Sequence, residues 1–197
     1  MASVTSSAGT RDRLLTAANE LFRAQGFNGT SLSQIVKASK ATTGSLYHFF
    51  PGGKDELTAE VLRTSGVAYG NLVELVVRAA ADPATGLDDA FAGAAELMLG
   101  TDFIDPCPIG TIAREVASTH EPLRRVALGV MESWIEIFVA ILIEAGVSNA
   151  SSKRLAILTI ASIEGAFVVA RTMRDVAPFL EVGHALRDAI AAELPNG

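Results

Sequence analysis

Apolar residues recur at the spacing of an α-helix along almost the whole chain, and this recurrence restricts the fold more than any other feature. One face of residues 11–25 carries Leu14, Leu15, Ala18, Leu21 and Phe22, and Gly26 follows where such a helix would end. The alternation of polar and apolar residues that marks a half-buried strand is absent over long stretches. The sequence therefore predicts an all-α protein.

Breaker and capping residues divide this pattern into separate helices. Asp82-Pro83 is expected to end one long helix, Thr85 to Asp88 to cap the next, and residues 100–108 to be irregular. The expected helices span about residues 11–25, 31–39, 43–49, 54–80, 85–99, 109–118, 121–145, 151–173 and 178–193.

Cysteine content and the distribution of apolar residues indicate the compartment. The single cysteine, Cys107, excludes an intrachain disulfide and suits a reducing cytosol. The N-terminal sequence MASVTSSAGTRDR lacks the apolar core of a secretory signal. Residues 137–143 are too few to span a membrane, and residues 155–170 carry Glu164 at their middle. We therefore expect a cytoplasmic protein with no membrane partner.

The net charge of −6 conceals a basic N-terminal quarter. Residues 11–54 contain six basic and two acidic side chains, which gives +4 and leaves −10 for the rest of the chain. A basic segment joined to an acidic body favours a polyanion-binding module beside a body that binds something else. The signal is weak alone, because many solvated faces carry a few lysines.

The segment PGGK at residues 51–54 suggests a loop that binds the phosphates of a nucleotide. Such a loop requires the pattern G-x-x-x-x-G-K-[ST] after a strand. Here the position of the first glycine is His48, the position of the final hydroxyl residue is Asp55, and the preceding segment reads as a helix. A tight turn between two helices explains the segment better.

Residues 31–49 have the pattern of a helix-turn-helix. Ser31 and Gln34 form a capping box at the start of the first short helix. In the second, Leu46, Phe49 and Phe50 would face the core, while the opposite face carries hydroxyl, tyrosine and histidine side chains that can bond phosphates or base edges. From these residues alone, a polar helical hairpin without a ligand is nearly as consistent.

The stretch from Arg11 to Leu62 resembles the N-terminal domain of TetR-type transcriptional regulators. The matching sequence is LLTAANELFRAQGFNGTSLSQIVKASKATTGSLYHFF, followed by KDEL. The insertion PGG, the order Tyr-His-Phe-Phe at residues 47–50 and the motif DPCPIG at residues 105–110 resemble the lincomycin-resistance-repressor-like branch of that family. Drug-like or flavonoid-like inducers are what this branch suggests.

The resemblance implies a division of the chain into two domains. Residues 1–53 would form a three-helix DNA-binding domain with the helix-turn-helix, and residues 1–9 would be a disordered arm. Residues 54–197 would form a larger helical domain for ligand binding and dimerisation.

The resemblance also implies roles for individual residues at DNA. Thr43 and Ser45 would contact base edges, and Lys54 would bind a phosphate. The complete set of implied DNA contacts is Thr30, Ser31, Thr42, Thr43, Gly44, Ser45, Tyr47, His48 and Lys54. Helix capping alone remains the alternative for the hydroxyl residues that begin helices, and plain exposure is the alternative for the histidine.

No constellation of catalytic or metal-binding residues stands out in the sequence. His120 and His184 are far apart and lack partners at metal-ligand spacing, and Cys107 has no histidine near it in sequence. No Ser-His-Asp or paired-carboxylate pattern is evident. We therefore expect no enzyme, no metal and no cofactor.

Aromatic and apolar residues on several helices of the body are most often simply core, but in this family the body encloses a pocket for an apolar or aromatic molecule. Glu164 and Arg171 are candidate polar anchors, because each lies in an apolar helix. The candidate ligand-binding residues are Phe103, Cys107, Ile109, Met131, Trp134, Phe138, Glu164, Phe167 and Arg171.

Helices 151–173 and 178–193 are rich in Ala, Ile, Leu and Val, which favours a homodimer interface built as a four-helix bundle, as in the family. A dimer would place two recognition helices about 34–36 Å apart on a near-palindromic operator. The predicted function is a dimeric repressor released from double-stranded DNA by a small apolar or aromatic effector. A DNA-binding regulator without ligand control and an all-helical enzyme or carrier remain alternatives.

Overall fold

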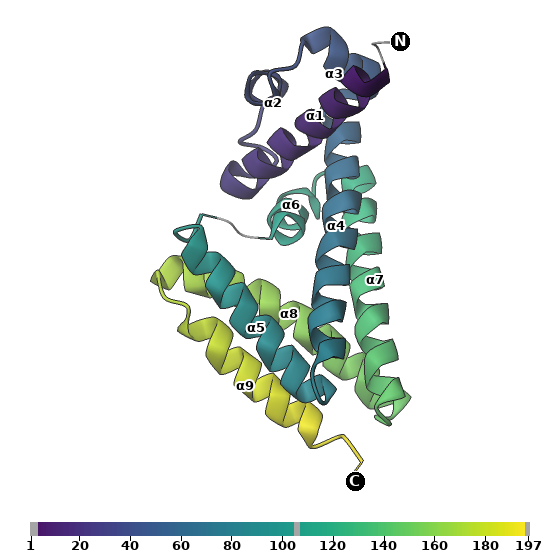
Figure 1. The fold of residues 1–197 in the computed structure, drawn as a ribbon, viewed down its shortest axis with the longest axis vertical. Coiled ribbons are helices and arrows are strands. Elements are labelled where there is room, and N and C mark those ends of the chain that lie inside the picture. The colour runs from purple at the N-terminus through teal and green to yellow at the C-terminus, as the bar shows by residue number, and fades with distance from the viewer. Residues whose placement is uncertain (1–3, 105–106, 196–197) are drawn as a thin grey trace. The chain divides into compact units, whose positions relative to one another are not determined.

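In the computed structural model, which describes residues 4–104 and 107–195, these residues form nine α-helices and no strand (Figure 1). The all-α prediction is therefore confirmed. The first two residues of the motif DPCPIG, Asp105 and Pro106, lie outside the described residues. The helices are α1 (Val4–Gln25), α2 (Leu32–Ser39), α3 (Thr43–Phe49), α4 (Gly53–Ala79), α5 (Pro83–Gly100), α6 (Pro108–Val116), α7 (Glu121–Glu144), α8 (Asn149–Met173) and α9 (Ala177–Ala191).

The chain divides into two compact units whose boundary differs from the one expected at residues 53 and 54. The first unit comprises Met1–Gly66 and Pro108–Leu128, and the second comprises Val67–Cys107 and Gly129–Gly197. The first unit therefore contains the start of α4, all of α6 and the first turns of α7 in addition to α1, α2 and α3.

The first unit is built around the apolar face of α1. Leu14, Ala18 and Phe22 are fully buried at the helical spacing, together with Ile35 from α2 and Leu46 from α3. Each of these side chains contributes about 1.5–3 kcal/mol by leaving water, apart from the smaller alanine. This burial fixes which faces of α2 and α3 remain exposed.

Helix α1 begins earlier than the sequence pattern suggested. It starts at Val4, so residues 4–9 are helical where a disordered arm was expected, and residues 1–3 lie outside the described part. No proline interrupts residues 4–10, so the backbone can extend the helix that the apolar face of residues 11–25 stabilises.

Helix α6 is held to the turn after α1 by one carboxylate. The backbone amide of Asn28 donates a hydrogen bond of 2.7 Å to Oε2 of Glu115. Gly26, at φ +75°, ends α1, and a Cβ atom there would collide with the same carboxylate. Glycine is therefore favoured at position 26 by the left-handed backbone, whereas the end of the flexible Glu115 side chain could move to make room for a Cβ atom.

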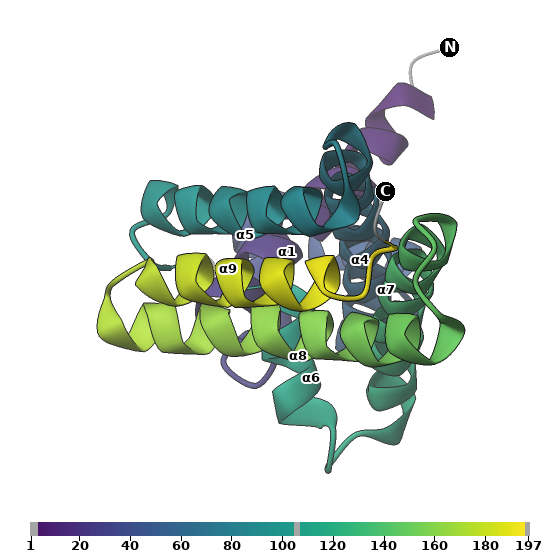
Figure 2. The same ribbon diagram turned by 90° about the horizontal axis from the view of Figure 1, so that it is seen from below.

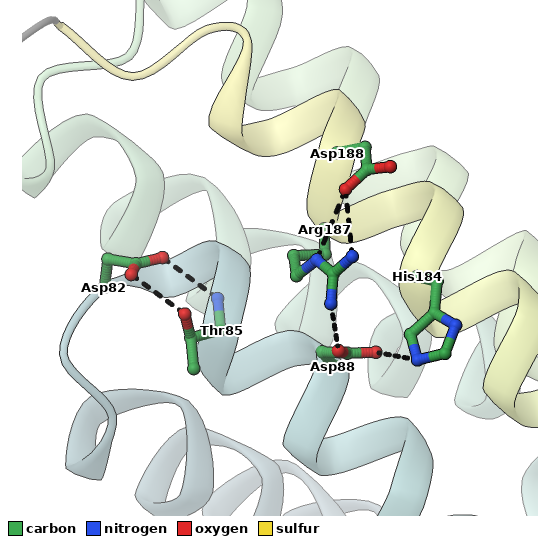
Figure 3. Close-up of polar contacts among 6 residues, drawn as sticks. All are labelled: Asp82, Thr85, Asp88, His184, Arg187 and Asp188. Atoms are coloured by element: carbon green, nitrogen blue, oxygen red, sulfur yellow. Dashed lines mark hydrogen bonds and ion pairs between the residues drawn. The ribbon is translucent and has the colours of Figure 1, made fainter.

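In the second unit, α9 packs against both α5 and α8, and the three helices run beside one another (Figure 2). Gly183 on α9 permits the contact with α5, because a Cβ atom there would lie 2.9 Å from Oδ1 of Asp88 and from Cβ of Phe91. Arg187 then donates to Oδ2 of Asp88 at 3.0 Å, while His184 lies 3.8 Å from Oδ1 (Figure 3).

Asp82 is the N-cap of α5. The sequence pattern predicts this cap three residues later, at Thr85 to Asp88. Oδ1 of Asp82 accepts from the Thr85 amide at 2.9 Å and its Oδ2 from the Thr85 hydroxyl at 2.9 Å (Figure 3). Pro83 follows at the first helical position, where a missing N–H costs nothing. The Asp-Pro pair therefore starts a helix as well as ending one.

By length and composition alone, α7 and α8 are apolar enough to cross a membrane. This is weak evidence, because core helices of soluble proteins meet the same test, and a third of each apolar window is buried within the described residues.

Candidate DNA-binding surface and ligand cavity

Hydrogen bonds at the helix ends position α2 and α3. The Ser31 amide donates to Oε1 of Gln34 at 2.7 Å, and the Gln34 amide donates to the Ser31 hydroxyl at 3.3 Å, which completes the capping box. Lys40 ends α2 in the left-handed conformation at φ 53°. The tight turn at this residue sets the direction of α3, as a helix-turn-helix requires.

One face of α3 is exposed and polar. Thr43, Tyr47 and His48 are exposed, whereas Leu46 and Phe50 are buried in the core of the first unit. Because the buried side chains fix the rotation of the helix, the hydroxyls, the phenol and the imidazole all lie on the solvent side. Gly44 is also exposed, and a Cβ atom there would have only Thr42 near it.

Thr42 and Ser45 form a pair at the start of α3. The Ser45 amide donates to Oγ1 of Thr42 at 3.0 Å, and the two hydroxyl oxygens are 2.9 Å apart. Thr42 is therefore the N-cap of the helix. Each hydroxyl can still offer a hydrogen-bonding group to a ligand, because a hydroxyl has one donor and two acceptor sites.

The phosphate contact expected of Thr30 needs correction. Its side chain is 1% exposed, and its hydroxyl donates to the Gly26 carbonyl at 2.7 Å. This threonine therefore stabilises the turn between α1 and α2, and the neighbouring Ser31 is the exposed hydroxyl at that point.

Lys54 lies in the first turn of α4, with its ammonium 4.1 Å from the centroid of the Phe27 ring. Partial burial lowers the pKa of Lys54, whereas the carboxylates of Asp55 and Glu115 act in the opposite direction. The aromatic ring thus holds a cation at a helix start, where backbone amides also favour an anion.

Other basic residues of the first unit divide into two groups. Arg11 forms an ion pair of 2.6 Å with Glu60, and Arg13 donates to the Ser39 carbonyl at 3.0 Å, so both guanidinium groups stabilise the fold. Lys37 and Lys40 are exposed at the end of α2. These two lysines were counted in the basic N-terminal quarter without a role of their own, and they are now further candidates for phosphate contacts.

The second unit contains a cavity of about 340 Å³ lined by residues of α4, α5, α7 and α8 and by Cys107. This volume is at the lower end of the range typical of small-molecule sites. The lining is almost entirely apolar. It comprises Tyr69, Gly70, Leu72, Val73, Val76, Leu87, Asp89, Ala90, Phe91, Gly93, Ala94, Leu97, Cys107, Trp134, Ile137, Phe138, Thr159, Ile160, Ile163, Glu164 and Phe167.

Five of the nine residues expected at a ligand line this cavity: Cys107, Trp134, Phe138, Glu164 and Phe167. The other four, Phe103, Ile109, Met131 and Arg171, lie outside this lining.

Ile109 and Phe103 pack against residues outside the cavity. Ile109 is fully buried on α6, within the first unit. Phe103 follows α5 at φ 60°, with the Arg174 guanidinium 5.1 Å from its ring centroid. Met131 on α7 is half-buried outside the lining, and Arg171 on α8 points to solvent as an exposed residue. Arg171 therefore anchors nothing in the cavity.

The sequence reasoning missed the contributions of α4 and α5. Ala90, Gly93 and Ala94 line the cavity from α5, and Gly70 lines it from α4. Small residues on the inward side of a helix leave space that large residues would fill. The run AFAGAA at residues 90–95 was the available signal, but a search for aromatic side chains passes over it.

Neither histidine singled out in the sequence belongs to a metal site within the described residues, where no group of three potential ligands occurs. His120 pairs with Asp55, with 3.0 Å between Nε2 and Oδ2.

A helix-turn-helix with an exposed polar second helix is the fold of a DNA-binding transcriptional regulator. The N-terminal family model described as bacterial regulatory proteins of the tetR family matches residues 14–61. The model described as the C-terminal domain of LmrA/YxaF-like transcriptional regulators matches residues 83–185. The chain belongs to the TetR family, in its LmrA/YxaF-like group, and is a transcriptional regulator, not an enzyme.

Similarity to individual proteins extends over nearly the full length. The chain is 36% identical over 177 residues to the uncharacterized regulator YxaF of Bacillus subtilis, covering 90% of this chain and 93% of that one. It is 31% identical over 180 residues to the regulator LmrA of Bacillus subtilis, covering 91% and 96%. The fold matches a TetR regulatory protein from Rhodobacter sphaeroides with a TM-score of 0.81, 21% identity and coverage of 90% and 97%.

Proposed function

We propose that the chain is a repressor that leaves its operator when an apolar or aromatic small molecule binds the cavity. The observation that carries this proposal is the cavity of about 340 Å³, enclosed by helices of the unit that does not contain the helix-turn-helix. A regulator without ligand control has no need of such a space, since unfilled apolar volume costs stability.

In this proposal, α3 enters the major groove of DNA. Thr43 and Ser45 contact base edges, because both lie in the first turn of the helix, where Thr43 is exposed and Ser45 is half-buried. Ser31, Tyr47 and His48 bond the sugar-phosphate backbone. Small residues at this surface allow the helix to approach the bases closely.

The positive charges of the first unit supply the contacts that do not depend on sequence. In this proposal, Lys54, Lys37 and Lys40 each bind a DNA phosphate and thereby release condensed counterions. This division predicts that affinity comes mainly from the lysines and operator preference mainly from α3.

The proposed dimer forms through α8 and α9. Apolar residues are exposed along α8, and Leu180 is an exposed apolar residue of α9. On α8 they are Ile157, Leu158, Val168, Val169 and Met173. Burial of such a surface against a second copy forms the four-helix bundle expected from the sequence. The same pairing accounts for the apolar residues exposed on α8 in a protein that we place in the cytoplasm.

Ligand control requires that the effector bind the DNA-incompetent state more tightly than the DNA-bound state. A release of 10- to 100-fold corresponds to roughly 1.4–2.8 kcal/mol of coupling free energy. The near-palindromic operator would present two half-sites about 34–36 Å apart.

The test uses the full chain and fluorescently labelled DNA from the region upstream of its own gene. Anisotropy titrations at physiological salt should give a Kd in the nanomolar range for this DNA and a much weaker affinity for a scrambled duplex. Compounds that raise the melting temperature of the protein are then added to the complex. Specific binding that no stabilising compound reverses would favour the regulator without ligand control.

A further inference from the structure

The charged groups around the cavity are all of one sign. Asp89 on α5 and Glu164 on α8 contribute carboxylates, and the described residues that line the cavity include no lysine, arginine or histidine. Arg171, the cation expected to serve as an anchor, is exposed and outside the lining. The ionisable side chains of the lining therefore give the cavity a negative charge.

The two carboxylates differ in their surroundings. Glu164 is half-buried, and Trp134 and Phe167 line the same space. Asp89 is exposed. Attraction to a carboxylate is much stronger within an apolar enclosure than in water, so Glu164 dominates the interaction with any charge on a ligand.

The negative charge of the cavity lining discriminates among ligands that have the same apolar body but different charges. An anionic ligand would lose its hydration and meet a like charge without a compensating cation in the lining. A neutral alcohol would gain apolar burial and could donate a hydrogen bond to a carboxylate, but it would gain no ion pair. A protonated amine would gain apolar burial, an ion pair with a carboxylate and attraction to the faces of aromatic rings.

We propose that the cavity binds an apolar molecule that carries a positively charged amine, and that Glu164 is the acceptor for its ammonium group. The inference rests on the proposed function only for the consequence of binding, which is release of DNA. Binding preference itself depends on the cavity alone, so the two are measured separately.

The test compares three compounds with one apolar body: 1-adamantylmethylamine, 1-adamantylmethanol and 1-adamantanecarboxylate. The chain has one tryptophan, and Trp134 lines the cavity, so its fluorescence reports binding at this site. None of the three compounds absorbs where tryptophan is excited. The ammonium compound should bind about 10-fold or more tightly than the alcohol, as expected for a charge-assisted hydrogen bond, and the carboxylate most weakly.

Substitution of the acceptor then identifies its role. Glu164→Gln preserves shape and removes the charge, so it should weaken binding of the amine about 10-fold and affect binding of the alcohol much less, because the glutamine oxygen can still accept its hydrogen bond. Glu96→Gln is the matched control, because Glu96 is an exposed carboxylate of α5 outside the cavity lining. If Glu164→Gln does not fold, Glu164→Asp retains the charge and should retain the preference for the amine.

The outcomes separate this inference from the proposed function. Equal or tighter binding of the alcohol, or no quenching of Trp134 by the amine up to its solubility limit, would overturn the inference. A preference for the amine that is insensitive to Glu164→Gln would do the same. Tight, Glu164-dependent binding of the amine without any release of labelled operator DNA would uphold the inference and contradict ligand-controlled repression.

Discussion

Two glycines of α5 should respond in opposite directions to the same substitution. A Cβ atom at Gly86 would lie 2.6 Å from the carbonyl oxygen and 2.7 Å from the Cα of Val77 on α4. At Gly93, in the same helix, nothing lies within 4 Å of such an atom. Gly86→Ala and Gly93→Ala therefore form a matched pair that tests how closely α4 and α5 approach.

The two substitutions share one energetic term and differ in another. Alanine is favoured over glycine in a helix by about 1 kcal/mol, so Gly93→Ala should stabilise the protein by roughly 0.5–1 kcal/mol. Gly86→Ala adds a clash with backbone atoms, which cannot rotate away as a side chain can. This clash should cost about 3 kcal/mol, at the upper end of the usual range for overpacking. After subtraction of the gain of about 1 kcal/mol in helix propensity, the net destabilisation should be about 2 kcal/mol.

Thermal unfolding monitored by circular dichroism measures the difference between the variants. At about 2–4 °C per kcal/mol for a chain of this size, the melting temperatures of the two variants should differ by roughly 6–12 °C. Protein concentration must be equal throughout, because dimerisation would make the melting temperature depend on it. Equal melting temperatures would contradict the close approach of α4 and α5, and with it the shape of the cavity that both helices line.

Three further predictions concern DNA contact, assembly and pH. Lys54→Ala should weaken binding to all DNA sequences about equally and lower the salt dependence by about one charge, whereas Thr43→Ala and Ser45→Ala should change the preferred bases in a binding-site selection. Equal, sequence-blind losses from all three would contradict the division of roles. Val168→Glu should shift the protein to monomers in sedimentation experiments and weaken operator binding; an unchanged dimer would exclude this face of α8 as the interface. Asp82→Ala should destabilise the protein by about 0.5–2 kcal/mol at neutral pH. Hydrogen bonds from Thr85 lower the pKa of Asp82, so the stabilisation is complete above the ordinary aspartate pKa and is lost as the pH falls through the lowered value. Melting curves from pH 7 to pH 2 should therefore converge for the variant and the parent, and a constant gap would refute the assignment.

The helices could be predicted from the sequence because their signals are local. The capping box at Ser31 and the apolar spacing of Leu14, Ala18 and Phe22 depend only on neighbouring residues, and the structure has both. Errors arose where a local signal has two meanings. Asp82-Pro83 interrupts the apolar pattern, but the same pair also caps and starts α5.

The exposed face of α3 was predictable for the same reason. Periodicity fixes which side chains are buried, and the remainder face solvent. Burial of Thr30 was not predictable, because it depends on the path of the chain from Gly26, whose carbonyl accepts its hydroxyl. A threonine before a helix looks identical in sequence whether it faces solvent or the turn behind it.

The cavity was predictable only in part, because periodicity distinguishes inside from outside but not core from cavity. Ile109 and Trp134 are both buried apolar residues, yet only Trp134 lines the space. The space exists because small residues such as Ala90 and Gly93 face it from α5. Their contribution appears only when the opposite helices are in place, so it depends on tertiary structure.

The difference between Glu164 and Arg171 shows what tertiary structure adds to the chemistry of recognition. Both residues lie on α8, seven positions apart, and both looked equally suitable as polar anchors in an apolar helix. Seven residues are close to two helical turns, so the two side chains share roughly the same side, but only Glu164 is level with the cavity. Of the two candidate anchors, only the carboxylate of Glu164 lines the cavity. The proposed ligand is therefore no longer any apolar or aromatic molecule but one that also carries a positive charge.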